Sequence, residues 1–318
     1  MMISKDDLYY DLMQQLNDSR YIPMWVKTYM KNKHIKESVT KYSPFRFRIY
    51  YENTDELYVN NLLKYIPNLQ RYFVEKVIKK VIPEKNFRKM NINIVLILSK
   101  KVKMIDKSKS KIINTKNINS GVCIHSSNPK DVHIIIYRKE DLMKVLFHEI
   151  IHYIGADLRF YDEFKINNIE MMIKKNVQSL LNVDIYFNEA FTEALARYHY
   201  IKFMIKNNNP NLNLKKQQKY SIEVVKKFFA LYDCRTLDEF SKLKNYNEES
   251  HAFSYIVIAS ALLNNEDFIT NIIINRNMEN LERIVYNSLF LNNEWYEKSK
   301  NKSGLNKDQM QFYLKLSI

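Results

Sequence analysis

The spacing of apolar side chains along the chain predicts a small sheet followed by a long helical region. Runs of alternating or β-branched apolar residues predict strands at 45–53, 91–104, 121–126 and 132–137. The last of these, VHIIIY, is apolar on both faces, which is typical of a strand inside a sheet. Helical spacing predicts helices at 5–33 (broken near Pro23), 54–82, 140–155, 163–182, 187–206, 216–232, 236–243 and 248–264.

This order of elements indicates an α+β fold. We expect residues 1–90 to form a mostly helical N-terminal region and residues 91–156 a lobe with a small mixed sheet that ends in the helix at 140–155. Residues 157–318 are expected to form an all-helical lobe. The chain has only 3 glycines and 6 prolines in 318 residues, so long helices are permitted over most of its second half.

The composition excludes several classes of protein. Hydrophobic residues make up 46% of the chain and charged residues 27%, which excludes a disordered or fibrous protein. Two cysteines, Cys123 and Cys234, cannot form a disulfide framework, which favours a reducing compartment. The N-terminus carries acidic residues, and no apolar run approaches the roughly 20 residues of a membrane span. We therefore expect a soluble, intracellular protein without a membrane partner.

The net charge of +15 suggests an anionic partner at first sight. Most of the positive charge is lysine, in a chain also rich in asparagine, isoleucine and tyrosine, which an AT-rich genome encodes most easily. The lysines are dispersed along the chain, and the densest run, at 107–116, is typical of a solvated loop. We therefore do not expect a specific nucleic-acid partner, because such a footprint would cluster on one face.

The helix predicted at 140–155 contains the motif His148-Glu149-Ile150-Ile151-His152. Two histidines at i and i+4 lie on one helical face, close enough to bind one metal ion, which is the pattern of a zinc site. Glu149 lies about 100° round the helix, where a carboxylate can take a proton from metal-bound water. An apolar stripe on the opposite face is expected to pack on the sheet: Met143, Phe147, Ile150 and Ile154. Gly155 is placed to end the helix with a left-handed cap.

A catalytic zinc needs a third protein ligand, and the residues alone leave two routes open. A histidine six residues beyond His152 is excluded, because that position is Leu158. An aspartate soon after the helix, Asp157 or Asp162, could serve. A glutamate on a later helix could also serve, and the segment NEAFTE supplies Glu189.

HEIIH followed by NEAFTE resembles the gluzincin group of zinc metallopeptidases, whose second motif is of the NExx(S/T)(D/E) type. The resemblance covers about residues 90–265 and implies a zincin-like fold, with one zinc ion held by His148, His152 and Glu189. It also implies that Glu193 is the carboxylate that orients a ligating histidine. Independently, a ligating imidazole needs an acceptor for its other N–H, and a carboxylate at i+4 from Glu189 can reach the same place.

Hydrolysis of a peptide at zinc also needs a donor to the developing oxyanion. The segment at 249–255 is predicted to open a helix with His251 and Tyr255 on one face, and it resembles the gluzincin helix that carries such a donor. We favour His251, with Tyr255 as the alternative. By the same resemblance, the strand at 121–126 could bind extended peptide, although it could equally be an ordinary edge strand. Cys123, His125 and His133 are interpreted as structural, because no CxxC pair accompanies them.

The sequence thus predicts a zinc metallopeptidase that acts on a peptide or protein substrate, with Glu149 as general base. Two alternatives stay open. One is a non-catalytic protein that keeps the zincin fold, or a basic structural protein associated with nucleic acid. The other is a secreted toxin protease exported without a signal peptide. The substrate, endo- or exopeptidase action and the oligomeric state are not encoded in any motif of the chain.

Overall fold

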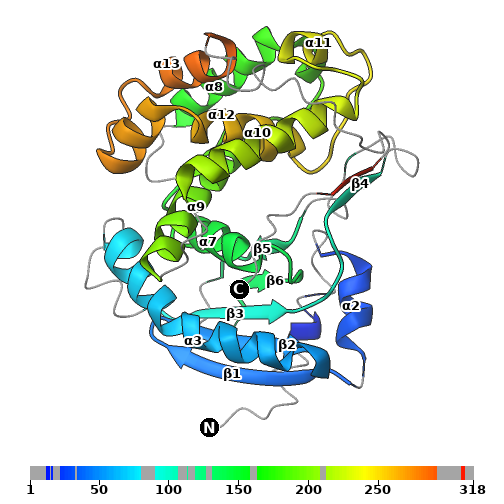
Figure 1. Cartoon of the computed structure of the whole chain (residues 1–318), viewed down its shortest axis with the longest axis vertical. Coiled ribbons are helices and arrows are strands. Elements are labelled where there is room, and N and C mark those ends of the chain that lie inside the picture. The colour runs from blue at the N-terminus through cyan, green and yellow to red at the C-terminus, as the bar shows by residue number, and fades with distance from the viewer. Residues whose placement is uncertain are drawn as a thin grey trace. The chain divides into compact units, whose positions relative to one another are not determined.

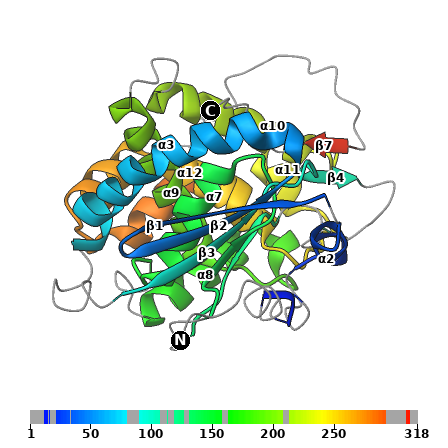
Figure 2. The ribbon, with the colours of Figure 1, turned by 90° about the horizontal axis from the view of Figure 1, so that it is seen from below.

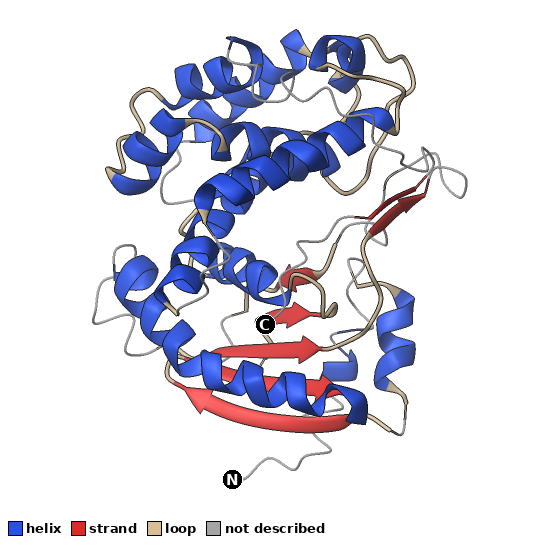
Figure 3. Cartoon of the chain, viewed as in Figure 1, coloured by secondary structure: helices blue, strands red, loops and turns tan. Residues whose placement is uncertain are grey.

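The computed structural model of the chain divides into two compact units. Unit 1 comprises Met1–Val102, Asn119–Ala156 and Tyr313–Ile318, and unit 2 comprises Lys103–Ile118 and Asp157–Phe312. The chain is α+β, with one small mixed sheet and a mostly helical C-terminal part (Figures 1 and 3). The residues that the structure describes are 12–14, 16, 22–32, 34–79, 90–106, 113, 119–126, 131–157, 163–207, 213–291 and 309–311.

Unit 1 is built on a five-stranded sheet with the order β1-β2-β3-β6-β5. β1 and β2 are antiparallel, β3 is parallel to β2 and to β6, and β5 is antiparallel to β6. The apolar segment at 132–137 contains β6 and lies inside the sheet, as predicted, and the segment at 121–126 contains the edge strand β5. The strands are β1 (Lys36–Tyr42), β2 (Phe45–Tyr51), β3 (Ile92–Ile97), β5 (Gly121–Cys123) and β6 (Ile134–Ile136).

Two helices pack on one face of this sheet. α3 contacts β1 and β2 (Figure 2), and α7 contacts β5 and β6. Aromatic rings join these layers, since Phe73 of α3 lies 6.0 Å from Phe45 and 4.4 Å from Phe147 of α7, between ring centroids. The helices of unit 1 are α2 (Met24–Met30), α3 (Glu56–Phe73) and α7 (Leu142–Tyr153), with a 3₁₀ turn η1 (Asn53–Asp55) and a π-helical turn η2 (Val74–Ile78).

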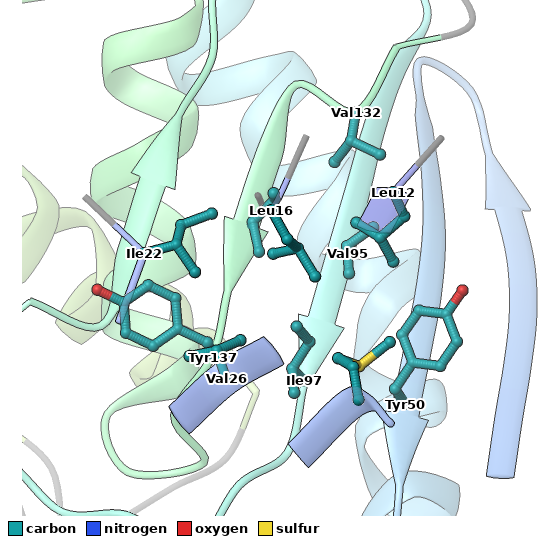
Figure 4. Packing of buried hydrophobic residues seen from close by; sticks show 11 residues of the cluster. Leu12, Leu16, Ile22, Val26, Tyr50, Val95, Ile97, Val132 and Tyr137 are labelled. Atoms are coloured by element: carbon teal, nitrogen blue, oxygen red, sulfur yellow. The ribbon is translucent and has the colours of Figure 1, made fainter. Parts of the chain in front are cut away.

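The opposite face of the sheet carries a second apolar layer, which includes α2 (Figure 4). Val95 and Ile97 of β3 belong to this layer, whereas Ile94 and Leu96 point to the other face, because side chains alternate along a strand. Both faces of β3 are buried, which is why its sequence reads as a continuous apolar run. The buried members of the layer are Leu12, Leu16, Ile22, Val26, Met30, Tyr50, Val95, Ile97, Val132, Ile135 and Tyr137.

Helix α7 follows the prediction closely, and its apolar stripe is buried. Phe147 and Ile150 have 0% exposure, and Met143 and Ile154 have 3% and 4%. The helix ends as predicted at Gly155, whose φ of +64° places it in the left-handed region. The N–H of Gly155 donates to the carbonyl of His152 at 2.9 Å, and the N–H of Ala156 donates to that of Ile151 at 3.0 Å. This is the Schellman arrangement, which fixes the last turn of the helix, where His152 lies.

Unit 2 is mostly helical. α9 packs against η5 and α12, α10 packs against the same two elements, and α13 packs against α8. Its helices are α8 (Glu163–Asn176), α9 (Phe187–Lys206), α10 (Leu214–Ala230), α11 (Leu237–Ser241), α12 (Ala259–Leu263) and α13 (Leu281–Tyr286). It also contains a 3₁₀ turn η4 (Gln178–Leu180), π-helical turns η5 (Ser254–Ile258), η6 (Phe268–Ile274) and η7 (Asn287–Leu291), and paired strands β4 (Met104–Asp106) and β7 (Gln309–Gln311).

The structure departs from the predicted elements in three places. Strand β1 and the β4–β7 pair were not predicted. In β1, KESVTKY, the side chains are exposed or half-buried, so no apolar alternation marks the strand. The helix predicted to start at 248 begins at Ala252 and continues through the π-helical turn η5.

Among the described residues, no single helix is both long and apolar enough to cross a membrane. One bent pair of helical segments, Ser254–Leu263 and Phe268–Ile274, passes the length and composition criteria when the two are taken together.

Candidate metal centre

The two histidines of the HEIIH motif point the same way from α7. Their Nε2 atoms are 3.0 Å apart, and the ring centroids are 4.6 Å apart at an angle of 73°. His148 is buried, with 5% exposure, and His152 is half-buried. With one Nε2 protonated and the other not, this spacing is also that of a hydrogen bond.

The spacing of the two nitrogens fits a shared zinc ion. Zn–N distances of about 2.0–2.1 Å and a tetrahedral angle place two nitrogen ligands of one zinc about 3.3 Å apart. The 3.0 Å between the Nε2 atoms is close to that value, and a small opening of the pair would reach it. The α-helix provides this arrangement, because it brings residues i and i+4 together on one face.

The carboxylate of Glu149 lies against the edge strand of the sheet. Its side chain is buried, with 7% exposure. A Cβ atom placed on Gly121 of β5 would lie 2.8 Å from Glu149 Oε1 and 3.0 Å from Glu149 Cγ. The carboxylate can occupy this position only because residue 121 has no side chain. Gly121 was not proposed from the sequence, although glycine is rare enough here, with three in the chain, to have drawn attention to it.

Glu189 lies in the first turn of α9, and a tyrosine holds its carboxyl group. The hydroxyl of Tyr255 donates to Glu189 Oε2 at 2.7 Å. The backbone N–H of Glu189 donates to the carbonyl of Tyr186 at 3.2 Å, which anchors the start of the helix. The structure therefore brings together two residues that the sequence proposed separately, one as a ligand and one as an oxyanion donor.

Glu193 lies one turn further along α9 and pairs with Arg197. Arg197 Nε donates to Glu193 Oε1 at 2.8 Å, with 12% and 3% of the two side chains exposed. Arg197 Nη2 also lies 3.5 Å from the backbone carbonyl oxygen of Tyr255. Arg197 was missed in the sequence, although its position four residues after Glu193 is the spacing of a helical ion pair.

His251 lies just before its helix instead of within it. Its backbone has a φ of +54°, in the left-handed region, and the helix starts at the next residue. Its ring centroid is 4.1 Å from that of Tyr186. Burial lowers the pKa of His251, while the charge of Glu189 and a hydrogen bond to the backbone of Asp184 partly oppose this shift. The imidazole is therefore biased toward its neutral form.

His125 and His133 lie close to the ends of strands β5 and β6 and contact other residues of unit 1. His133 is buried, with 1% exposure, and its Nδ1 accepts a hydrogen bond from the backbone N–H of Asn93 at 3.0 Å. Cys123 Sγ lies 3.9 Å from His125 Nε2, and the His125 ring stacks on Tyr153 with a centroid distance of 6.1 Å. The interpretation of Cys123, His125 and His133 as structural residues stays a prediction.

The sequence proposes three zinc ligands, and all three belong to the described part of the chain: His148, His152 and Glu189. The first two come from unit 1 and the third from unit 2. Of the two aspartates considered from the sequence, Asp157 is buried, with 1% exposure, and Asp162 lies outside the described residues.

The chain is similar to uncharacterized protein R210 of Acanthamoeba polyphaga mimivirus, with 28% identity over 188 residues, covering 53% of this chain and 46% of the relative. The chain thus matches less than half of the length of that relative. No protein-family model matches the chain, and no solved structure matches it.

Proposed function

We propose that the chain is a zinc-dependent peptidase of the gluzincin type, with a zincin-like fold. The observation that carries the proposal is the pair of imidazoles on α7, 3.0 Å apart, with the carboxylate of Glu149 on the neighbouring residue of the same helix. A helix that places a buried histidine, a half-buried histidine and a buried glutamate among apolar side chains needs a reason to do so, and metal chemistry supplies one.

The donor set fits a catalytic zinc. Two imidazoles and one carboxylate leave a fourth position open, as catalytic zinc sites require. When bound, zinc supplies Lewis-acid activation of water and of the substrate carbonyl group. The proposal requires α9 of unit 2 to present Glu189 to the two histidines of unit 1. Glu193 is proposed to orient one of those histidines through its ring N–H, with Arg197 holding the carboxylate of Glu193.

Glu149 is the proposed general base. Its carboxylate accepts the proton of the attacking water and delivers it to the leaving amine. Gly121 allows the carboxylate to lie directly beside β5, at the edge of the sheet. Because edge strands can pair with an extended peptide, β5 is the proposed binding site of the substrate backbone. His251 is the proposed donor to the oxyanion. It is favoured over the alternative, Tyr255, because the Tyr255 proton is directed to Glu189.

The decisive test combines metal analysis with a conservative substitution of the base. Purified protein should contain about one zinc per chain and cleave members of a peptide library, and a chelator should stop the cleavage. The Glu149→Gln variant should keep its zinc and lose at least about 100-fold in turnover, since a general base contributes 10²–10⁴-fold. Glu56→Gln, at an exposed glutamate of unit 1, should behave as the wild type.

Two results would overturn this proposal. One is a fully active Glu149→Gln variant, and the other is a protein that binds no divalent metal. Salt-dependent binding of nucleic acid, without zinc and without cleavage, would instead favour a basic structural protein, consistent with the net charge of +15.

A further inference from the structure

The contact between Tyr255 and Glu189 joins two elements of unit 2 that are 66 residues apart in sequence. Tyr255 lies in the π-helical turn η5, and Glu189 lies in the first turn of α9, against which η5 packs. At 2.7 Å, the distance between the phenol oxygen and Oε2 is that of a strong O–H···O hydrogen bond. A phenol has one proton to donate, and in this structure it is directed at the carboxyl group of Glu189.

Two further contacts hold η5 against the same stretch of α9. The backbone N–H of Tyr186, immediately before α9, donates to Ser254 Oγ at 3.3 Å. Arg197 Nη2 lies 3.5 Å from the carbonyl oxygen of Tyr255. Arg197, two turns beyond Glu189, thus holds the carbonyl group of Tyr255. The backbone at the start of α9 holds the neighbouring side chain of Ser254.

The residues of α9 that take part lie on one face of the helix. Glu189, Glu193 and Arg197 are spaced at i, i+4 and i+8, and Arg197 pairs with Glu193 at 2.8 Å. The environment is partly closed to water, because Ser254 has 0% exposure and Glu193 has 2%, whereas Glu189 and Tyr255 are half-buried. Hydrogen bonds in such an environment hold a side chain in one rotamer more firmly than they would at the surface. The π-helical turn is an irregularity of a kind that is frequent at functional sites.

We propose that Tyr255 is a positioning residue for the metal ligand Glu189, and that Arg197 and Ser254 keep Tyr255 in place. This inference rests on the proposed function, and it goes further by assigning the Tyr255 hydroxyl to the carboxylate ligand instead of to the substrate. The hydroxyl fixes the orientation of the carboxyl group that would hold the ion. The hydrogen bond thereby supplies part of the ordering that metal binding needs.

The test is the affinity of the metal-free full-length chain for zinc, measured by competition with a chelating dye. Tyr255→Phe removes only the hydroxyl oxygen and should weaken zinc binding about 10- to 100-fold, the usual effect of removing a group that orients a ligand. Tyr198→Phe is the matched control, because it removes a hydroxyl from α9 itself. It should bind zinc with the wild-type affinity. The metal-free Tyr255→Phe chain should still unfold in one cooperative transition, with stability lowered by no more than the loss of one hydrogen bond, which excludes general damage to the fold.

A double-mutant cycle distinguishes positioning from a structural role. If Tyr255 acts through Glu189, Tyr255→Phe should have no further effect on zinc affinity in a Glu189→Ala background. Raising the zinc concentration should also restore the turnover of Tyr255→Phe. Unchanged zinc affinity with a lower kcat would overturn the inference and assign Tyr255 to the oxyanion. A wild-type chain that binds no zinc would overturn the proposed function itself, so the two failures are distinguishable.

Discussion

The side chains of His148, Glu149 and His152 are adjacent on α7, but each is held in place by a different neighbour. The histidines contact each other, His152 is followed by the Gly155 cap, and Glu149 lies against the backbone of β5 at Gly121. The HEIIH motif alone predicts that the two histidines lie side by side, because the helix sets their geometry. They do not predict Gly121, which lies 28 residues earlier in the chain.

Gly121→Ala should lower activity without removing the metal. The new Cβ would lie 2.8 Å from Glu149 Oε1 and 3.0 Å from Val145 Cγ1, so a side chain or the strand must shift. We expect a stability loss of about 1–3 kcal/mol, as for other overpacked sites. A displacement of the base by about 1 Å can cost up to 10²-fold in turnover. Zinc affinity, measured in parallel, should stay within a factor of about two, because neither histidine is touched.

A second substitution separates the two clashes. Val145→Ala in the Gly121→Ala background removes the contact with residue 145 but leaves the contact with Glu149. Stability should recover while turnover stays low. Recovery of both would mean that Glu149 had not been displaced, and the role assigned to Gly121 would be wrong.

At the scale of elements, regular helices were predicted well and irregular or exposed segments were not. The bounds of α9 agree with the predicted 187–206, because apolar residues recur along it at helical spacing. Strand β1 was missed because its side chains face water, and it is defined by pairing with β2 instead of by its own pattern. The helix that contains Tyr255 was predicted to start at 248, but it starts at Ala252. A carboxylate that precedes the helix accepts a hydrogen bond from a backbone N–H of its first turn.

That carboxylate belongs to Glu248, and it should make the stability of the protein depend on pH. The backbone N–H of Phe253 donates to both carboxylate oxygens of Glu248, at 3.3 Å to Oε1 and 3.1 Å to Oε2. Glu248 is buried, with 8% exposure. Burial raises the pKa of Glu248 to about 7, although hydrogen bonding with Tyr246 and with the backbone of Phe253 and Ala252 opposes the shift.

Because this pKa is higher in the folded state than in the unfolded state, the native protein binds the extra proton between pH 4.5 and about 7. The stabilisation is complete below pH 4.5 and is lost as the pH rises through 7. At 1.36 kcal/mol per pKa unit, the free energy of unfolding should fall by about 3 kcal/mol across this window. Urea unfolding at a series of pH values measures it. Glu248→Gln should flatten this part of the profile, and an unchanged profile in that variant would contradict the assignment.

At the scale of the whole molecule, the chain passes between the two units more than once. It leaves unit 1 after Val102, returns at Asn119 and leaves again after Ala156. Arg138, with 1% exposure, donates to the carbonyl oxygens of Val102 and Asn119 and so ties both crossing points to the sheet. The candidate ligands follow the same division, with two histidines in unit 1 and one glutamate in unit 2.

If one ion is shared by ligands of both units, zinc should stabilise the whole chain. At a free zinc concentration of 100 times its Kd, the gain should be about 2.7 kcal/mol. Thermal unfolding of the metal-free chain at increasing zinc concentrations measures it. Glu189→Gln should need much more zinc for the same shift, whereas Glu266→Gln, at an exposed glutamate of unit 2, should behave as the wild type. An equal shift in the Glu189→Gln variant would show that the ion is held by unit 1 alone.

The sequence by itself determined the helix that carries HEIIH, its buried stripe, its glycine cap and the internal strand beside it. These follow from local rules, because the period of a helix or strand decides which side chains share a face. Tertiary structure alone decided that Gly121 lies against Glu149, that Tyr255 donates to Glu189 and that Arg197 pairs with Glu193 while approaching Tyr255. Contacts of this kind depend on how distant elements pack and which rotamers they select, and no local pattern in the chain encodes that choice.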